Sequence, residues 1–178
     1  MHVCTHRRLF PIFKPLGLNH TYYRNEKGYL SYPALVDSYW GVLDTERPAN
    51  ITPFQRSNVA SLIGDDGIVC TMADAVLFFK GLMEGKLIST NSLKLMQKWV
   101  KNSKGELTYG FGLYRYNAGG LEGVGHGGGG IGAGCMFLYV PALKTYVFIA
   151  ANVGVLTRGK LSKKADSLRN EVLMALFM

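Results

Sequence analysis

Hydrophobic residues in the middle of this chain recur at helical spacing. From residue 72 to residue 83 they fall on one face of a helix, at Met72, Val76, Phe79 and Met83. The preceding segment, Thr71-Met72-Ala73-Asp74, has the form of a capping box, which predicts that the helix begins there. A second helix is expected from Ser89 or Thr90, with the inner face Leu93, Met96 and Val100.

Further along the chain the pattern changes to that of strands. Residues 109–116 alternate with a period of two and are rich in aromatic side chains. Residues 122–128, 135–140 and 145–151 are further strand candidates, and the short connection 141–144 predicts a hairpin between the last two. We therefore expect a four-stranded antiparallel meander.

A last helix is expected after about residue 160, and it would pack on the sheet. Its apolar stripe is Leu161, Ala165, Leu168, Val172 and Leu176. Residues 1–71 look irregular: the apolar run 9–13 is stopped by Pro15, and residues 44–54 carry two prolines and predict a loop. The expected fold class is α+β, with an irregular and helical part over residues 1–108 and an antiparallel sheet with its helix over residues 109–178, both within one domain.

Composition and charge narrow the class of protein. The chain has 178 residues, 48% hydrophobic and 18% charged, which is typical of one globular domain. Its formal net charge is +8, but the basic residues are scattered and no aromatic residues interleave with them, so we expect no nucleic-acid partner. No apolar stretch reaches the length of about 18 residues that predicts a membrane span, and the first residues do not have the pattern of a signal peptide.

Three cysteines are widely spaced and do not predict a disulfide framework. Cys70 and Cys135 lie in apolar runs, so we expect buried thiols, and a reducing compartment is mildly favoured. His2, Cys4 and His6 alternate near the start of the chain but have no further ligand cluster, so no metal site is expected. We also expect no cofactor.

The glycine-rich segment over residues 123–132 carries the candidate chemistry. It holds one imidazole, His126, among glycines that leave backbone amides uncovered. The spacing of its glycines formally matches a dinucleotide-binding loop, but a strand is expected to follow instead of a helix, which excludes that interpretation. A structural histidine bonded to a backbone carbonyl remains the alternative for His126.

The sequence contains no recognisable motif for a serine nucleophile. No serine has a lysine three residues later, and there is no Gly-x-Ser-x-Gly elbow. The tripeptide Tyr23-Arg24-Asn25 has the form Tyr-x-Asn, but such tripeptides are frequent by chance.

Several segments, in order, resemble the serine β-lactamase and penicillin-binding-protein-like hydrolases, the family of class C β-lactamases, D-alanyl-D-alanine carboxypeptidases and related esterases. Residues 12–21 are similar to the family's "IFxPLGMxxT" segment, and residues 66–74 to its "GGlxSTAxDL" helix start. Residues 85–89 are similar to "GKLLS", residues 109–112 to "YGLGW", and residues 125–129 to "GHGGGxPG". The resemblance covers nearly the whole chain from about Leu9.

The resemblance assigns roles to the glycine-rich segment. The family's third motif, Lys-Thr-Gly or His-x-Gly, falls on His126-Gly127-Gly128. This implies that His126 orients the substrate and supports proton transfer, that the N–H of Gly129 belongs to the oxyanion hole, and that Gly127 and Gly128 line the substrate site. A glycine at position 127, where the family often has threonine, removes a hydroxyl that grips a substrate carboxylate. The resemblance therefore favours esterase or D-Ala-D-Ala peptidase chemistry on a small ester, amide or peptidoglycan-like substrate.

The chain also departs from the family pattern. In the family, Ser-x-x-Lys and Tyr-x-Asn lie upstream of the "PLGM" segment, and only about fourteen residues precede that segment here. We therefore expect the C-terminal portion of a β-lactamase-like fold, without the N-terminal strands and the nucleophile helix, and inactive alone. Exposed strand edges would then recruit a partner, so a homo-oligomer or a complementary chain is expected. The alternative function is a non-catalytic module that binds a peptidoglycan-like or peptide ligand.

Overall fold

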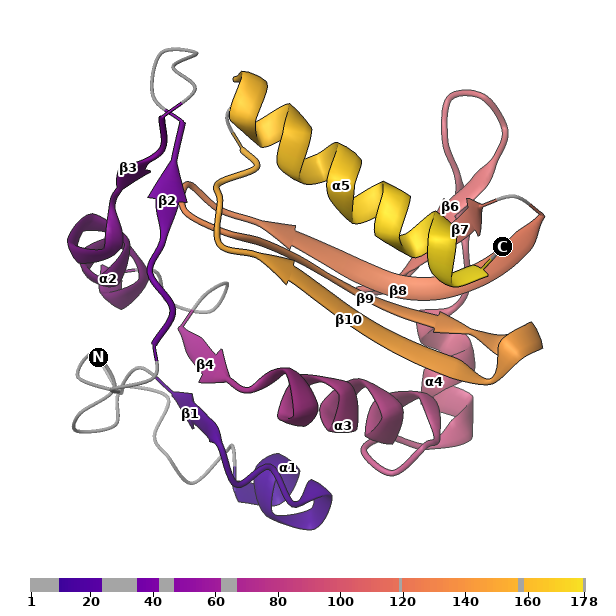
Figure 1. Ribbon diagram of the computed structural model, residues 1–178. Helices are drawn as coiled ribbons and strands as arrows, with labels where there is room; N and C mark the ends of the chain where they lie inside the picture. Colours follow the sequence, from indigo (N-terminus) through magenta and orange to yellow (C-terminus); the bar gives the residue numbers. More distant parts are fainter. Residues whose placement is uncertain are drawn as a thin grey trace.

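A computed structural model describes residues 10–23, 35–41, 47–61, 67–118, 120–156 and 159–177. Its centre is a six-stranded antiparallel sheet in which strands that follow one another in sequence are neighbours, in the order β10-β9-β8-β7-β6-β5 (Figure 1). The strands are β5 (Val100–Lys101), β6 (Leu107–Tyr109), β7 (Tyr114–Ala118), β8 (Leu121–Gly129), β9 (Gly134–Val140) and β10 (Thr145–Ala151). The antiparallel meander is confirmed, with two more strands than expected.

One additional strand arises because the strand expected over residues 109–116 is split into β6 and β7. The chain turns between Tyr109 and Tyr114, which pair with each other across these two strands. Gly112, with a φ of 71°, allows this turn. Large side chains alternate with glycine up to Leu113, and the alternation resumes in the opposite phase at Tyr114, where β7 begins.

The other additional strand is β5, whose Val100 was expected on the inner face of the second helix. That expectation is wrong, because Val100 lies beyond the end of that helix at Met96 and is 59% exposed.

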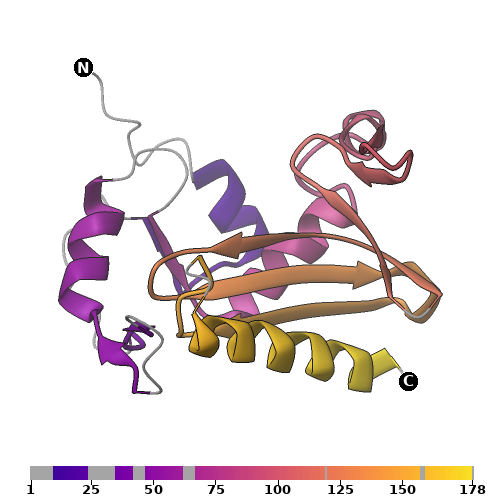
Figure 2. The ribbon, with the colours of Figure 1, turned by 90° about the horizontal axis from the view of Figure 1, so that it is seen from above.

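The sheet has one helix packed on each face (Figures 1 and 2). Alternate residues of β9 are buried toward α5 (Lys160–Phe177), where Met136, Leu138 and Val140 form a core with Leu173. The intervening Phe137 faces α3 (Met72–Met83), and its ring centroid lies 5.4 Å from that of Phe79. The alternation along β9 therefore places successive side chains in two different layers.

The apolar stripe predicted for α5 does not face the sheet along most of the helix, so this prediction is wrong. Leu168, Val172 and Leu176 are exposed, by 61%, 39% and 57%. Leu173 lies toward the sheet instead, on the helix face that also buries Ser162, whose hydroxyl donates to the carbonyl oxygen of Gly154 at 2.6 Å. A serine that satisfies a buried carbonyl can occupy a core position that a count of apolar residues gives to leucine.

The two helix starts in the middle of the chain are confirmed. Thr71 caps α3, its hydroxyl oxygen accepting from the N–H of Asp74 at 3.2 Å. Ser89 caps α4 (Thr90–Met96) in the same way, accepting from the N–H of Ser92 at 3.1 Å. These caps could be predicted because they depend only on residues three positions apart.

The inner face of α3 differs from the expected one. Phe79 is buried as predicted, but Met72 is 67% exposed, and the carboxyl group of Asp74 is buried instead. This carboxylate accepts from the backbone N–H of His20 and from the hydroxyl of Thr21, both at 2.8 Å. Asp74 thereby ties α3 to β1 (Thr21–Tyr23), which pairs with β4 (Ile68–Cys70).

The N-terminal part is more regular than expected. The apolar run forms the short helix α1 (Phe10–Leu16), which ends at Gly17 with a φ of 67°. α2 (Thr52–Ser61) begins inside the expected loop, because Pro53 occupies the first turn, where no backbone N–H is required. β2 (Tyr39–Trp40) and β3 (Ala49–Asn50) form a two-stranded sheet before it.

Several expectations concern residues beyond those described. They are the alternating His2, Cys4 and His6, the last two residues of the Tyr-x-Asn tripeptide, and Asp66 of the helix-start segment. Within the described ranges, no helix combines the length and hydrophobicity that crossing a bilayer requires.

Candidate functional site

His126 lies on β8, at the centre of the sheet. It is half-buried and stands opposite Phe137 of β9. Side chains directly opposite each other in an antiparallel pair share one face of the sheet. His126 therefore faces the α3 side, because the ring of Phe137 packs on Phe79 of that helix.

The strand that carries His126 has a free edge along its last residues. β8 pairs with β9 as far as Gly129, opposite Gly134, but its pairing with β7 ends at Gly125, opposite Tyr114. Among the described residues, no strand continues this second edge. Residues 126–129 are thus held on one side only.

The direction of each backbone amide follows from the ladder. The N–H of Gly130 donates to the carbonyl oxygen of Ala133, so Gly130 faces the β9 side. Alternate residues of an antiparallel strand face the same neighbour, which places the N–H of Gly128 on the β9 side as well. The N–H groups of Gly127 and Gly129 point the other way, toward the free edge. Gly128 and Gly129 are exposed, so this edge is open to solvent.

Several glycines of β8 are required by close packing against neighbouring residues. A Cβ atom on Gly123 would lie 2.6 Å from Leu138 Cδ1, and one on Gly129 would lie 2.6 Å from Val155 Cγ2. One on Gly125 would overlap the carbonyl oxygen of Phe137. Gly127 and Gly128 have room for a Cβ atom, with nearest neighbours 3.6 Å and 3.5 Å away. The absence of side chains therefore serves the packing of the sheet as well as access to its backbone.

Two tyrosines, Tyr109 of β6 and Tyr114 of β7, lie beside the imidazole. The hydroxyl oxygen of Tyr109 lies 3.4 Å from Nε2 of His126. The ring centroid of Tyr114 lies 5.3 Å from that of His126 and 4.4 Å from that of Tyr109. Sequence reasoning did not connect these residues with His126, although Tyr109 belongs to the segment that resembles "YGLGW".

The thiols differ from their expected burial. Cys70 is exposed and Cys135 is half-buried, so the expectation of two buried thiols is wrong for Cys70. β4 is short and its third residue lies next to the helix cap, which leaves the apolar run uncovered. Although the residue as a whole is exposed, partial desolvation of its thiol group, together with the nearby carboxylate of Asp74, raises the pKa of Cys70. A raised pKa keeps the thiol protonated near neutral pH, which argues against Cys70 as a substitute nucleophile.

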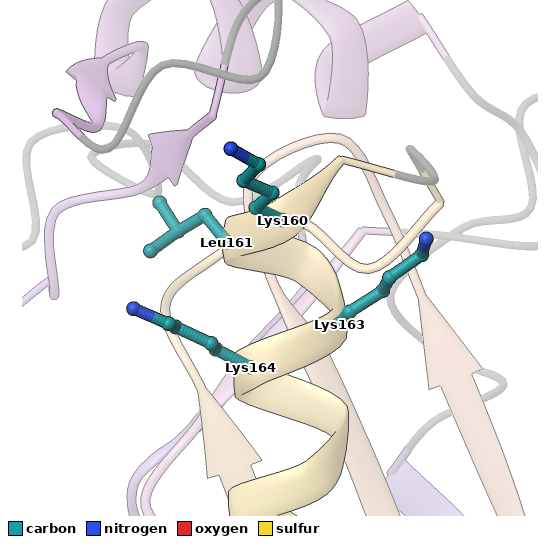
Figure 3. A pocket seen from close by; sticks show the side chains of 4 residues that line it. All are labelled: Lys160, Leu161, Lys163 and Lys164. Atoms are coloured by element: carbon teal, nitrogen blue, oxygen red, sulfur yellow. The ribbon is translucent and has the colours of Figure 1, made fainter.

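A separate hollow lies at the start of α5. Lys160, Leu161, Lys163 and Lys164 line it, and Figure 3 shows the three lysine side chains extending away from one another. It contains no group that could act as a nucleophile or a general base at neutral pH. No group of three His, Cys, Asp or Glu side chains in the described parts of the chain could hold a metal ion.

The chain matches a known protein family and is similar in fold to several solved structures. The family described as Beta-lactamase matches residues 11–167. No curated protein sequence matches the chain.

Three solved structures illustrate the fold likeness. D-amino acid amidase from Ochrobactrum anthropi SV3, complexed with L-phenylalanine, has a TM-score of 0.68 and 21% identity, covering 94% of this chain and 51% of that one. The octameric penicillin-binding protein homologue from Pyrococcus abyssi has a TM-score of 0.61 and 25% identity, covering 80% and 32%. D-stereospecific amidohydrolase from Streptomyces sp. has a TM-score of 0.63 and 19% identity, covering 82% and 43%. This chain thus spans about half, or less, of the length of each of these neighbours.

Proposed function

Since this chain belongs to the Beta-lactamase family of serine hydrolases, we propose that it supplies the carbonyl-binding part of an acyl-transfer site. The observation that carries the proposal is the free edge of β8 beside His126, where none of the described strands pairs with the side to which the N–H groups of Gly127 and Gly129 point. Backbone N–H groups fixed in a strand stabilise the negative charge that develops on a carbonyl oxygen under attack, and one such donor contributes roughly 10²–10³-fold in rate.

In the proposed reaction, this chain binds the substrate carbonyl group and a second polypeptide segment supplies the nucleophile. A serine supplied by polypeptide outside the present sequence attacks the substrate carbonyl carbon, and the carbonyl oxygen becomes an oxyanion that accepts from the N–H of Gly129. When the oxyanion returns to a carbonyl, the bond to the leaving amine or alcohol breaks, and the proton of the serine hydroxyl passes to the leaving group with support from His126, three residues before Gly129 on β8. Water then attacks the acyl-serine, which releases the carboxylic acid and restores the serine hydroxyl. The substrate is a small amide or ester, or a peptidoglycan-like peptide.

Support for amide chemistry comes from two sources. The structural neighbours include D-amino acid amidase and a D-stereospecific amidohydrolase. Position 127 carries glycine, where the resemblance places a threonine whose hydroxyl grips a substrate carboxylate. Both favour amidase, esterase or peptidase activity over hydrolysis of a β-lactam.

The purified 178-residue chain is expected to show no turnover above background. None of its serines has a lysine one helical turn later to take its proton. The measurement is hydrolysis of p-nitrophenyl esters, D-phenylalanine amide and nitrocefin. Turnover that disappears when a serine of this chain is changed to alanine would place the nucleophile here and contradict the proposed division.

A non-catalytic binding module is the second candidate function. It is favoured by the same absence of a Ser-x-x-Lys motif from the sequence, together with an exposed strand edge that can bind an extended peptide. Saturable binding with no turnover, even when the rest of a β-lactamase-like fold is supplied as a second polypeptide, would favour this function over acyl transfer.

We further propose that the chain associates with a second copy or with a complementary chain. Three apolar side chains of α5 form an exposed stripe on the face away from the sheet, namely Leu168, Val172 and Leu176. Exposed apolar stripes and open strand edges are typical of surfaces that bind another polypeptide.

Analytical ultracentrifugation at micromolar concentration tests this association. We expect the chain to sediment as a dimer or larger species, and Leu168→Glu with Leu176→Glu to shift it toward the monomer. Lys163→Glu, at an exposed position outside the stripe, is the control and should leave the distribution unchanged. A wild-type chain that sediments as one monomeric species would count against self-association.

A further inference from the structure

The ring of His126 has a defined neighbour at one of its two nitrogens. Tyr109 brings its hydroxyl oxygen to 3.4 Å from Nε2. This distance is at the long end for a hydrogen bond, as is common for catalytic groups before substrate binds. In a neutral imidazole one nitrogen carries the proton and the other accepts. A tyrosine hydroxyl can donate to an unprotonated Nε2 or accept from a protonated one, and donation is favoured because a phenol O–H is more acidic than a neutral imidazole N–H.

The backbone around Tyr109 is built to hold that residue in place. The N–H of Gly110 donates to the carbonyl oxygen of Leu113 at 2.8 Å, and the N–H of Phe111 donates to that of Met96 at 2.9 Å. A Cβ atom on Gly110 would overlap the carbonyl oxygen of Met96, so only glycine allows this close approach. Leu113 is 2% exposed and anchors the turn in the core.

Tyr114 adds a second restraint on the same group of rings. It stands opposite Tyr109 in the β6–β7 pair and opposite Gly125 in the β7–β8 pair. Its ring is close to both the imidazole and the ring of Tyr109, with centroid distances of 5.3 Å and 4.4 Å. Packing by Tyr114 limits ring rotation but offers no hydrogen bond to Nε2, which separates its contribution from that of Tyr109.

We propose that Tyr109 is a positioning residue for His126, donating its hydroxyl proton to Nε2 and thereby fixing the imidazole in the tautomer that carries its proton on Nδ1. The role in catalysis rests on the proposed function of His126. The tautomer itself is a property of the free chain. A fixed tautomer leaves the Nδ1 proton as the only ring proton that a neutral His126 can donate.

Nitrogen NMR of the chain labelled with ¹⁵N-histidine tests the proposal. The signals of His126 are identified by their loss in His126→Gln, and spectra are recorded at a pH where the imidazoles are neutral. The wild-type chain is expected to show a protonated Nδ1 and an unprotonated Nε2. Tyr109→Phe is expected to change the ratio of the two tautomers by about fivefold toward protonated Nε2, the effect of one ordinary hydrogen bond.

Tyr114→Phe is the matched control, since it removes a hydroxyl from the same ring cluster and should leave the tautomer ratio unchanged. A wild-type spectrum with the proton on Nε2 would overturn the proposal without any variant. So would a Tyr109→Phe spectrum with the wild-type ratio. Neither result depends on turnover, so each would leave the acyl-transfer proposal standing; conversely, a chain that binds no carbonyl ligand would remove that proposal and leave the tautomer assignment intact.

Discussion

Gly125→Ala is expected to lower the free energy of unfolding by about 2–3 kcal/mol. The added Cβ would overlap the carbonyl oxygen of Phe137 in the neighbouring strand. A flexible side chain could move aside, but this oxygen belongs to the backbone of β9, so the β8–β9 ladder has to shift. Urea unfolding followed by circular dichroism measures the loss, and Tm should fall by roughly 5–10 °C for a domain of this size.

Gly127→Ala is the matched control on the same strand and the same face. Its Cβ would lie 3.6 Å from the nearest atom, the carbonyl oxygen of Cys135, which is an ordinary contact. We expect the free energy of unfolding to change by less than about 0.5 kcal/mol, as at other tolerant surface sites. Equal losses in the two variants would show that the glycines of β8 are not distinguished by packing and would contradict the strand register described above.

A pair of proline substitutions is expected to produce the largest difference in stability. Gly128→Pro removes an N–H that faces β9 and leaves a carbonyl oxygen there without its donor. Together with steric disruption of the ladder, this should cost about 3 kcal/mol or more. Gly127→Pro removes an N–H that faces the free edge, where proline is tolerated, and should cost no more than about 1 kcal/mol.

Thermal unfolding of the two proline variants gives the comparison directly. The expected result is a folded Gly127→Pro protein and a Gly128→Pro protein that is strongly destabilised or unfolded. The reverse order would mean that Gly127 faces β9 and Gly128 the free edge, which would remove the basis for assigning the N–H of Gly129 to an oxyanion hole.

Local features of the fold could be predicted from the sequence because neighbouring residues determine them. β10 has the bounds expected for it, and the caps at Thr71 and Ser89 depend on side chains within one turn. Features that depend on distant segments could not be predicted in this way. The carboxylate of Asp74 is buried only because His20 and Thr21, more than fifty residues earlier, supply its donors.

In the candidate site, too, local features could be predicted from the sequence and features that depend on distant segments could not. His126 and the three glycines after it could be singled out as a chemically unusual segment, and they lie together because they are consecutive on β8. The free edge was not predicted, because it depends on where β7 begins, and a single strand was expected across the turn that separates β6 from β7. The approach of Tyr109 to His126 follows from the same turn.

Binding of a carbonyl ligand at the free edge of β8 tests the proposed function most directly. The measurement is a titration of the ¹⁵N-labelled chain with D-phenylalanine amide and with acetyl-D-alanyl-D-alanine, followed by amide NMR. We expect saturable shifts of the Gly127 and Gly129 amides, little change at Gly123, and loss of these shifts in Gly127→Pro. Saturable shifts confined to the hollow at Lys160–Lys164, or none at Gly127 and Gly129 at millimolar ligand, would contradict the proposed carbonyl-binding role of β8.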